Sequence, residues 1–182
     1  MATKCLLAVN DRMVPLAGIL LVVALLVTPA RAIDTPNERI TLVDLTGVHV
    51  VFDEIGEAGE RQGVTRALLQ PEVEQQLRRA GLRILTPTEA LASSGRPTLH
   101  LRVSVVRVGE EQDLYVYSVD LVLRQQVRLV RSRVIESYAV TWSENRAAGA
   151  ARAAQLGVVR NVLLKKVDEF VAAWRESNLE RY

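Results

Sequence analysis

Few residues of this sequence could do chemistry, and its two histidines are the first to consider. His49 and His100 each lie in a stretch with the pattern of a strand. If those strands were neighbours, the two imidazoles together with Asp53 or Glu54 could bind zinc. The sequence has no CxxC or HxxxH spacing, which favours histidines on the solvated face of a sheet, so we expect no metal site.

Signatures of catalysis are missing from the rest of the sequence. It contains no GxSxG or HExxH motif, and its only cysteine, Cys5, precedes the predicted mature chain. The glycine-rich residues 56–63 lack the Gly-Lys-Ser/Thr ending of a phosphate loop, and their glutamates would repel phosphate. Asp120 and Glu136 could form an acid/base pair across adjacent strands, but paired charges on a solvated sheet face are the commoner arrangement. We therefore predict a protein that is not an enzyme and has no cofactor, with an enzyme lacking recognisable motifs as the remaining alternative.

Aromatic and basic residues suggest binding instead. Period-two spacing places Tyr138 and Trp142 on one face of a predicted strand, where such residues are most often ordinary core. If they face outward beside Arg102 and Arg124, the open face of the sheet becomes an aromatic and basic recognition surface. The candidate interaction surface comprises Arg102, Asp120, Arg124, Arg128, Tyr138 and Trp142.

These residues depend on one long strand for their position. Residues 114–131 (LYVYSVDLVLRQQVRLVR) alternate apolar and polar side chains, as a half-buried strand requires. Straight, this stretch would reach roughly 60 Å, whereas a compact domain of 150 residues is only about 38 Å across. We therefore expect a bulge or bend at residues 124–126, where Gln125 replaces an apolar residue, and antiparallel pairing with both flanking strands.

The remaining stretches predict elements that cover the apolar side of this strand. Strands are expected at 48–53, 82–86, 98–108 and 134–143, helices at 65–81 and 152–178, a helical turn capped by Thr88 at 87–94, and loops at 54–63 and 144–151. Pro71 either kinks the first helix or begins it, and the second version is the more economical. The order β-α-β-β-β-β-α predicts an α+β two-layer sandwich, with a mostly antiparallel sheet of about four to five strands and two main helices on one face.

The N-terminal segment has the pattern of a signal peptide. Lys4 and Arg12 supply basic charge, residues 14–27 are apolar, and residues 30–32 (ARA) are acceptable to a signal peptidase. About 14 apolar residues fall short of the roughly 20 that a membrane-spanning helix needs, which disfavours an uncleaved anchor. We therefore predict a signal peptide at 1–32, an extended N-terminal arm at 33–47, a single α+β domain at 48–178 and a C-terminal tail at 179–182.

Charge and cysteine content exclude several classes of protein. The chain has 23 basic and 21 acidic residues, and removing Lys4, Arg12, Arg31 and Asp11 with the signal peptide leaves 20 of each. This balance gives no electrostatic support for nucleic acid as a partner. Because Cys5 precedes the apolar run, no lipid attachment site follows the signal peptide. We expect the mature protein in the periplasm or the medium, with membrane contact only through the signal peptide before cleavage.

Taken together, several stretches resemble an uncharacterised family of small exported (periplasmic) bacterial proteins. They are residues 63–65 (GVT), 73–74 (VE), 77–85 (LRRAGLRIL), 115–118 (YVYS), 139–142 (AVTW) and 167–171 (VDEFV). The resemblance brings no activity or site residue, and Pro71 departs from the helix former expected there. The element order is also similar to the N-terminal domain of the Tol-system propeller protein and related outer-membrane accessory proteins, a likeness that concerns the fold alone.

These observations lead to a functional expectation. We expect a non-catalytic, exported interaction or accessory domain that meets an envelope protein through the uncovered sheet face or an edge strand. The alternative is a carrier for a small apolar or lipidic ligand held between sheet and helices. A ligand-sized cavity between the two layers would favour the carrier.

Overall fold

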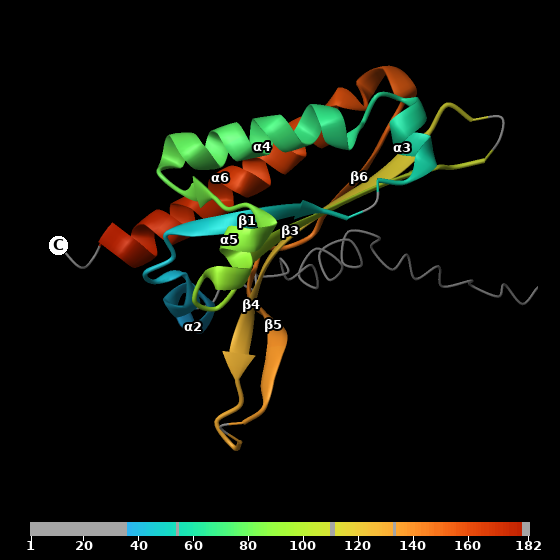
Figure 1. Cartoon of the computed structure of the whole chain (residues 1–182). Coiled ribbons are helices and arrows are strands. Elements are labelled where there is room, and N and C mark those ends of the chain that lie inside the picture. Colours follow the sequence, from blue (N-terminus) through green and yellow to red (C-terminus); the bar gives the residue numbers. More distant parts are fainter. Residues whose placement is uncertain (1–35, 54, 110–111, 133, 180–182) are drawn as a thin grey trace, which may run out of the picture. The chain divides into compact units, whose positions relative to one another are not determined.

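A mixed six-stranded sheet with helices packed against it makes up the part of the chain that the computed structural model describes, residues 36–53, 55–109, 112–132 and 134–179. These residues belong to one compact unit, Ala32–Tyr182. The fold is the α+β two-layer sandwich predicted from the sequence (Figure 1). The predicted signal peptide at 1–32 and most of the predicted tail lie outside the described residues.

The sheet is ordered β2-β1-β3-β4-β5, and β6 also pairs with β4. Its strands are β1 (Gly47–Phe52), β2 (Arg83–Ile84), β3 (Thr98–Arg107), β4 (Tyr115–Arg128), β5 (Glu136–Ser143) and β6 (Ala147–Ala151). β1 runs parallel to β2 and β3, whereas β4 is antiparallel to β3, β5 and β6. The predicted antiparallel pairing of the long strand with both neighbours is therefore confirmed.

β6 was expected to be a loop, because a run of alanine and glycine has low strand propensity. Packing explains why small residues are used in this strand. Gly149 is the partner of Tyr117 on β4, and a Cβ atom at Gly149 would lie 2.5 Å from the Tyr117 Oη. The buried tyrosine thus occupies the space of the missing side chain, and backbone pairing with β4 decides the strand.

Two long helices, α4 (Arg66–Ala80) and α6 (Gly157–Leu179), cover one face of the sheet (Figure 1). The stripe predicted on α6 is confirmed, because Val159, Leu163, Val167 and Phe170 are fully buried against the strands. α5 (Pro87–Ala92) lies beside β1, and its N-cap is Thr86 rather than the predicted Thr88. Thr86 accepts from the Glu89 N–H, while Glu89 accepts from the Thr86 N–H, which completes a capping box.

α4 is one continuous helix, so the prediction that it begins at Pro71 is wrong. Thr65 caps it by accepting a hydrogen bond from the Leu68 N–H at 3.3 Å, and Gly81 ends it in the left-handed conformation with φ of 101°. Pro71 is exposed on the outer side of the helix. Burial of Leu69, Val73 and Leu77 across the proline offsets the missing hydrogen bond at that position.

The segment predicted as an extended arm, residues 33–47, forms two short helical turns over residues 36–42. α2 (Pro36–Arg39) and the 3₁₀ helix η1 (Ile40–Leu42) precede β1. Leu42 is fully buried, and its carbonyl accepts from Asn178 Nδ2 of α6 at 3.0 Å. Trp174 Nε1 donates to the Leu45 carbonyl at 2.8 Å. The domain therefore begins before residue 48, because α6 is long enough to hold this segment.

Two smaller elements complete the fold. The loop predicted at 54–63 contains α3 (Glu57–Arg61), in which the buried Gly59 lies against Val105 of β3. The 3₁₀ helix η2 (Ala153–Gln155) leads into α6. Among the residues that the structure describes, no helix is both long and apolar enough to span a membrane.

Candidate functional site

Five of the six residues of the predicted interaction surface lie together on the sheet face opposite α4 and α6, here called the open face. Cross-strand partners share a face of a sheet. Arg102 on β3 is the partner of Asp120 on β4, and buried Leu101 and Val103 beside Arg102 point to the helices. On the same face, further along β4, Gln126 is the partner of Tyr138 on β5. Arg124 and Arg128 occupy alternate positions of β4 on this face.

Trp142 is not part of this surface, contrary to the prediction. Its side chain is 0% exposed, and its ring packs edge-on against Phe170 of α6 with centroids 5.1 Å apart. The reason is a β-bulge: Leu123 pairs with Trp142, but the next residue, Arg124, pairs with Val140. Thr141 is the extra residue, and one extra residue switches the face of every side chain beyond it.

The bulge predicted at residues 124–126 of the long strand is therefore wrong in its strand: the register shifts between Leu123 and Arg124, next to the predicted position, but the extra residue belongs to β5. The period-two pattern that placed Tyr138 and Trp142 on one face stops at Thr141. Tyr138 is 47% exposed, whereas Trp142 joins the core. The sequence carries no signal for the strand in which a bulge will occur, because either strand of the pair can take the extra residue.

A charge row of alternating sign crosses the open face. Arg102 Nη2 lies 3.0 Å from Asp53 Oδ2, and Arg146 Nη2 lies 3.1 Å from Asp120 Oδ2. His100 Nδ1 lies 3.5 Å from the second oxygen of Asp53. Since Arg102 and Arg146 are largely exposed, these pairs contribute little to stability. Their effect is a fixed pattern of charge that a partner can match.

Beside the charge row is a hollow of about 260 Å³, here called the central hollow. It is lined by Asp53, His100, Arg102, Asp120, Val122, Arg124 and Val140. Within the described residues, Arg124 makes no ion pair, whereas Asp53, Arg102 and Asp120 are all paired. The central hollow therefore offers one uncompensated guanidinium beside two valines.

The structure does not bring together all the ligands of the zinc site considered above. β1 and β3 are neighbours, as it required, but His49 Nδ1 lies 2.9 Å from the Leu85 carbonyl while His100 turns to Asp53. Glu54 lies outside the described residues. In the described part of the chain, no group of three His, Cys, Asp or Glu side chains could hold a metal ion.

The suggested acid/base pair is not brought together. Asp120 pairs with Arg146, whereas Glu136 accepts from Arg128 Nη2 at 2.7 Å at the far end of the β4–β5 ladder. The hydrogen bond and positive charge of Arg128 hold the pKa of Glu136 below its ordinary value of 4.5. A carboxylate held ionised in this way is a poor proton donor at neutral pH.

A projecting hairpin extends the open face and was not predicted as such. β3 ends its pairing with β4 at Thr98 and Arg124, so residues 125–140 form a two-stranded hairpin arm that leaves the rest of the unit (Figure 1). Its tip, the described residues 129–132 and 134–135, is closed by a hydrogen bond from the Leu129 N–H to the Ile135 carbonyl at 3.1 Å. Unequal strand lengths in the sequence were the available signal, because the predicted strand 98–108 cannot pair with all of 114–131.

The base of the hairpin arm is anchored from several directions. The Gln126 N–H donates to the Gly95 carbonyl at 2.7 Å. Thr41 Oγ1 of η1 donates to the carbonyl of the bulge residue Thr141 at 3.0 Å, and Thr141 Oγ1 donates to Gln125 Oε1 at 2.8 Å. The arm thus leaves the sheet at a fixed bend.

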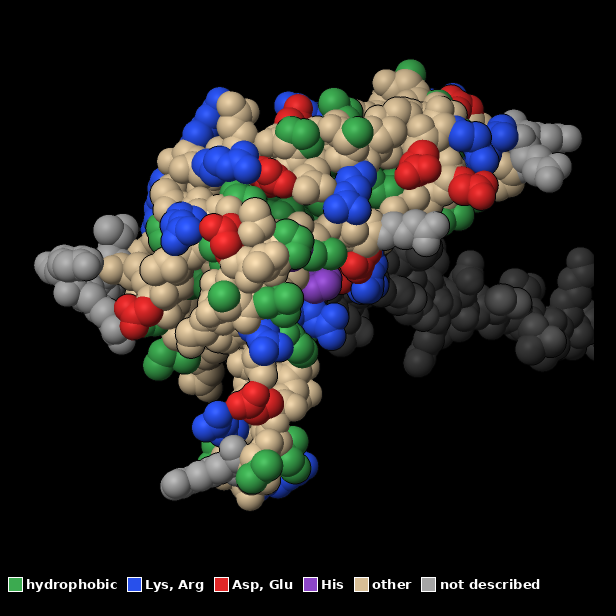
Figure 2. All heavy atoms as spheres, viewed as in Figure 1, with side chains coloured by type: hydrophobic (Ala, Val, Ile, Leu, Met, Phe, Trp, Pro, Cys, Tyr) green, Lys and Arg blue, Asp and Glu red, His purple; other side chains and the backbone are tan. Residues whose placement is uncertain are grey.

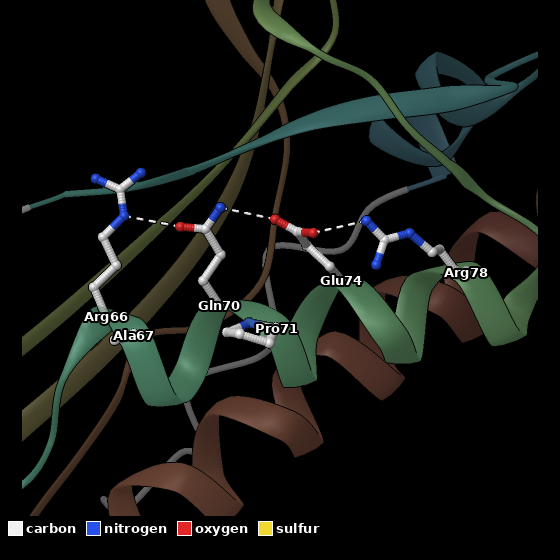
Figure 3. A pocket seen from close by; sticks show the side chains of 6 residues that line it. All are labelled: Arg66, Ala67, Gln70, Pro71, Glu74 and Arg78. Carbon is white, nitrogen blue, oxygen red and sulfur yellow. Dashed lines mark hydrogen bonds and ion pairs between the residues drawn. The ribbon is translucent and has the colours of Figure 1, made fainter.

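A second hollow, of about 520 Å³, lies along α4 and has a different character. Figure 3 shows Arg66, Gln70, Glu74 and Arg78 in a row beside Pro71, each joined to the next by a hydrogen bond or ion pair. Gln70 Nε2 donates to Glu74 Oε1 at 2.7 Å, and Arg78 Nη2 donates to Glu74 Oε2 at 2.8 Å. These polar groups satisfy one another along the helix, so the row stabilises α4 and leaves little for a ligand to bind.

Comparison of the chain with family models, with curated proteins and with solved structures finds no match. The resemblance to exported bacterial proteins therefore stays a prediction. The site has to be interpreted from its own geometry.

Proposed function

We propose that the protein is a non-catalytic, exported interaction domain that binds a protein of the cell envelope through its open face. The observation that carries this proposal is the convergence of Arg102, Asp120, Arg124 and Tyr138 on one sheet face opposite the long helices. Register, not flexible loops, sets the spacing of these side chains. A preorganised charged surface of this kind favours recognition of a complementary surface.

The chemistry of the open face also supports binding over catalysis. Its carboxylates at Asp53 and Asp120 are each paired with an arginine, so this part of the open face presents pairs of opposite charge. Alternating charges discriminate between partners, because a wrong partner places like charges together. The uncompensated Arg124 beside Val122 and Val140 offers an anchor for an acidic or carbonyl group of the partner.

The alternative, a carrier of an apolar or lipidic ligand between sheet and helices, has less support. Such a carrier needs a cavity of about 300 Å³ or more between the layers. Trp142 and Phe170 fill the space between β5 and α6, and both are fully buried. The central hollow and the hollow on α4 are lined by surface residues and lie outside this core.

The test is affinity purification of the tagged mature chain from envelope extract, with a charge-reversed variant and a matched control. Arg124→Glu changes the uncompensated cation of the central hollow, whereas Arg79→Glu changes an exposed arginine of α4 on the other side of the sheet. We expect a protein partner that the wild type and Arg79→Glu retain and that Arg124→Glu loses. Recovery of lipid without any protein partner, or equal capture by Arg124→Glu, would contradict the proposal.

A further inference from the structure

The tip of the hairpin arm exposes apolar side chains that contact little else in the folded unit. Val130 is 102% exposed, Val134 90% and Ile135 48%. Single exposed apolar residues are ordinary on a protein surface, but these three lie within one turn at the end of a projection. Figure 2 shows apolar side chains beside basic ones at the end of this projection. Because Val130 and Val134 are not buried, they do not stabilise the fold. Packing of the folded unit therefore does not explain why apolar residues occupy these positions.

The same segment is basic in a chain that is otherwise balanced. The hairpin arm, residues 125–140, contains three arginines, at positions 128, 131 and 133, against one acidic residue, Glu136, whereas the predicted mature chain has 20 basic and 20 acidic residues. Arg128 pairs with Glu136, but Arg131 and Arg124 make no ion pair within the described residues. The hairpin arm therefore combines an apolar end with uncompensated positive charge.

We infer that the tip inserts its valines into the surface of an anionic phospholipid bilayer, with Arg131 and Arg128 contacting the headgroups. Apolar side chains entering the acyl boundary with cations at headgroup level are the usual chemistry of peripheral membrane binding. A convex tip needs no preformed groove on such a surface, because a bilayer deforms around it. Whether the tip meets a membrane in the cell rests on the proposed location of the protein in the envelope. The vesicle experiment described below does not depend on that location.

Other occupants fit the tip less well. A second copy of the tip would bring the unpaired Arg131 of each chain together, and like charges repel. A protein partner would need a pocket that receives two separate valines on a convex end. Gly95 and Thr41 anchor the base of the hairpin arm, whereas the valines at its tip are exposed and available to meet a surface.

Vesicle flotation of the chain from residue 33 tests this inference. The described core runs from Leu42 to Ala173 inside the compact unit that starts at Ala32, so this chain retains the core. Vesicles of phosphatidylglycerol mixed with phosphatidylethanolamine are compared with neutral phosphatidylcholine vesicles. We expect flotation with the anionic vesicles only, and weaker flotation as the salt concentration rises.

Variants separate the tip from the rest of the surface. Val130→Ser with Val134→Ser should weaken binding by about tenfold or more, and Arg131→Gln by about fivefold. Leu91→Ser on α5 and Arg79→Gln on α4 remove an exposed apolar side chain and an exposed cation elsewhere, and should leave flotation unchanged. Circular dichroism verifies that each variant is folded.

Three results would overturn the inference: equal flotation with neutral vesicles, unchanged flotation of the double valine variant, or a tip that binds an acidic protein but no vesicle. The proposed function has a different readout. Capture of the envelope protein should depend on Arg124 in the central hollow and not on Val130 or Val134. Loss of one activity with retention of the other therefore shows which proposal fails.

Discussion

At the scale of single residues, the site depends on one extra residue in β5. Thr141 separates Tyr138, which belongs to the open face, from Trp142, which belongs to the core. Because of the bulge, one short strand contributes a side chain to the open face and another to the core. Two neighbouring aromatic residues with the same apparent periodicity therefore have unrelated roles.

This difference predicts opposite outcomes for two truncations. Trp142→Ala should lower the free energy of unfolding by about 3 to 5 kcal/mol, because it leaves a cavity against Phe170. Tyr138→Ala should change it by less than about 1 kcal/mol, because its side chain is half exposed and its hydroxyl accepts a long hydrogen bond, of 3.4 Å, from Arg96. Urea unfolding followed by circular dichroism measures both. A similar cost for the two variants would place both side chains in the core.

The sequence predicted most residues of the open face, but it placed Trp142 wrongly and missed Arg146. The alternation of polar and apolar residues correctly placed Arg102, Asp120, Arg124 and Arg128 on the open face. It does so because a strand with one buried face has polar residues at every second position. It failed for Trp142, since a bulge changes the count without changing residue type. Arg146, which pairs with Asp120, was missed because it lies in a stretch predicted as a loop.

At the scale of elements, packing overrides local preference in several places. α4 continues through Pro71, β6 forms from alanine and glycine, and α3 forms within a glycine-rich segment. In each case the element contacts a partner that the local sequence does not reveal. Helices and strands with a strong apolar period, such as α6 and β3, were predictable from their sequence alone.

Removal of the proline from α4 should stabilise the protein. Pro71→Ala restores an N–H that can donate to the Ala67 carbonyl and relieves the ring clash at that carbonyl. Because Pro71 is exposed, no packing is lost. We expect an increase of about 1 kcal/mol or more in the free energy of unfolding, measured by thermal and urea unfolding. Gln75→Ala, at another exposed position of the helix, serves as the control and should shift stability by less than about 0.5 kcal/mol.

The hairpin arm should loosen in acid. Arg128 holds the pKa of folded Glu136 below its unfolded value, so their contact stabilises the arm above the unfolded pKa and is lost as pH falls through the folded pKa. Nuclear magnetic resonance of the Val130 and Val134 methyl groups should report this change. Glu136→Gln removes the titrating group, and its methyl signals should no longer follow that transition. Identical titration curves for wild type and variant would rule out Glu136 as the cause.

At the scale of the whole molecule, the long helix α6 joins parts that are distant in sequence. It covers the sheet through its apolar stripe, and through Trp174 and Asn178 it holds the backbone at Leu45 and Leu42. α4 is attached through a hydrogen bond from Gln76 to the Leu164 carbonyl of α6 at 3.1 Å. The layers could be predicted from the order of elements, whereas these attachments of the N-terminal segment could not, because a polar helix end carries no partner signal.

The N-terminal segment should therefore be part of the stable fold. Leu42→Ala should cost about 2 to 5 kcal/mol, since Leu42 is fully buried. Ile40→Ala, two residues earlier and 69% exposed, should cost less than about 1 kcal/mol. Chemical unfolding of the two variants measures the difference. If both variants had equally small effects on the free energy of unfolding, the N-terminal segment would not be needed for stability.

The anchored base of the hairpin arm has a mechanical consequence. A stiff beam fixed at one end turns a push at its free end into torque at its mounting. Here the mounting comprises Gly95 and Thr41, which hold Gln126 and Thr141 and lie far apart in the sequence. A load on the valines would thus be felt at the loop before β3 and at η1, next to the start of β1. A push at the tip would therefore act on these two attachment points as well as on β4 and β5, which carry the arm.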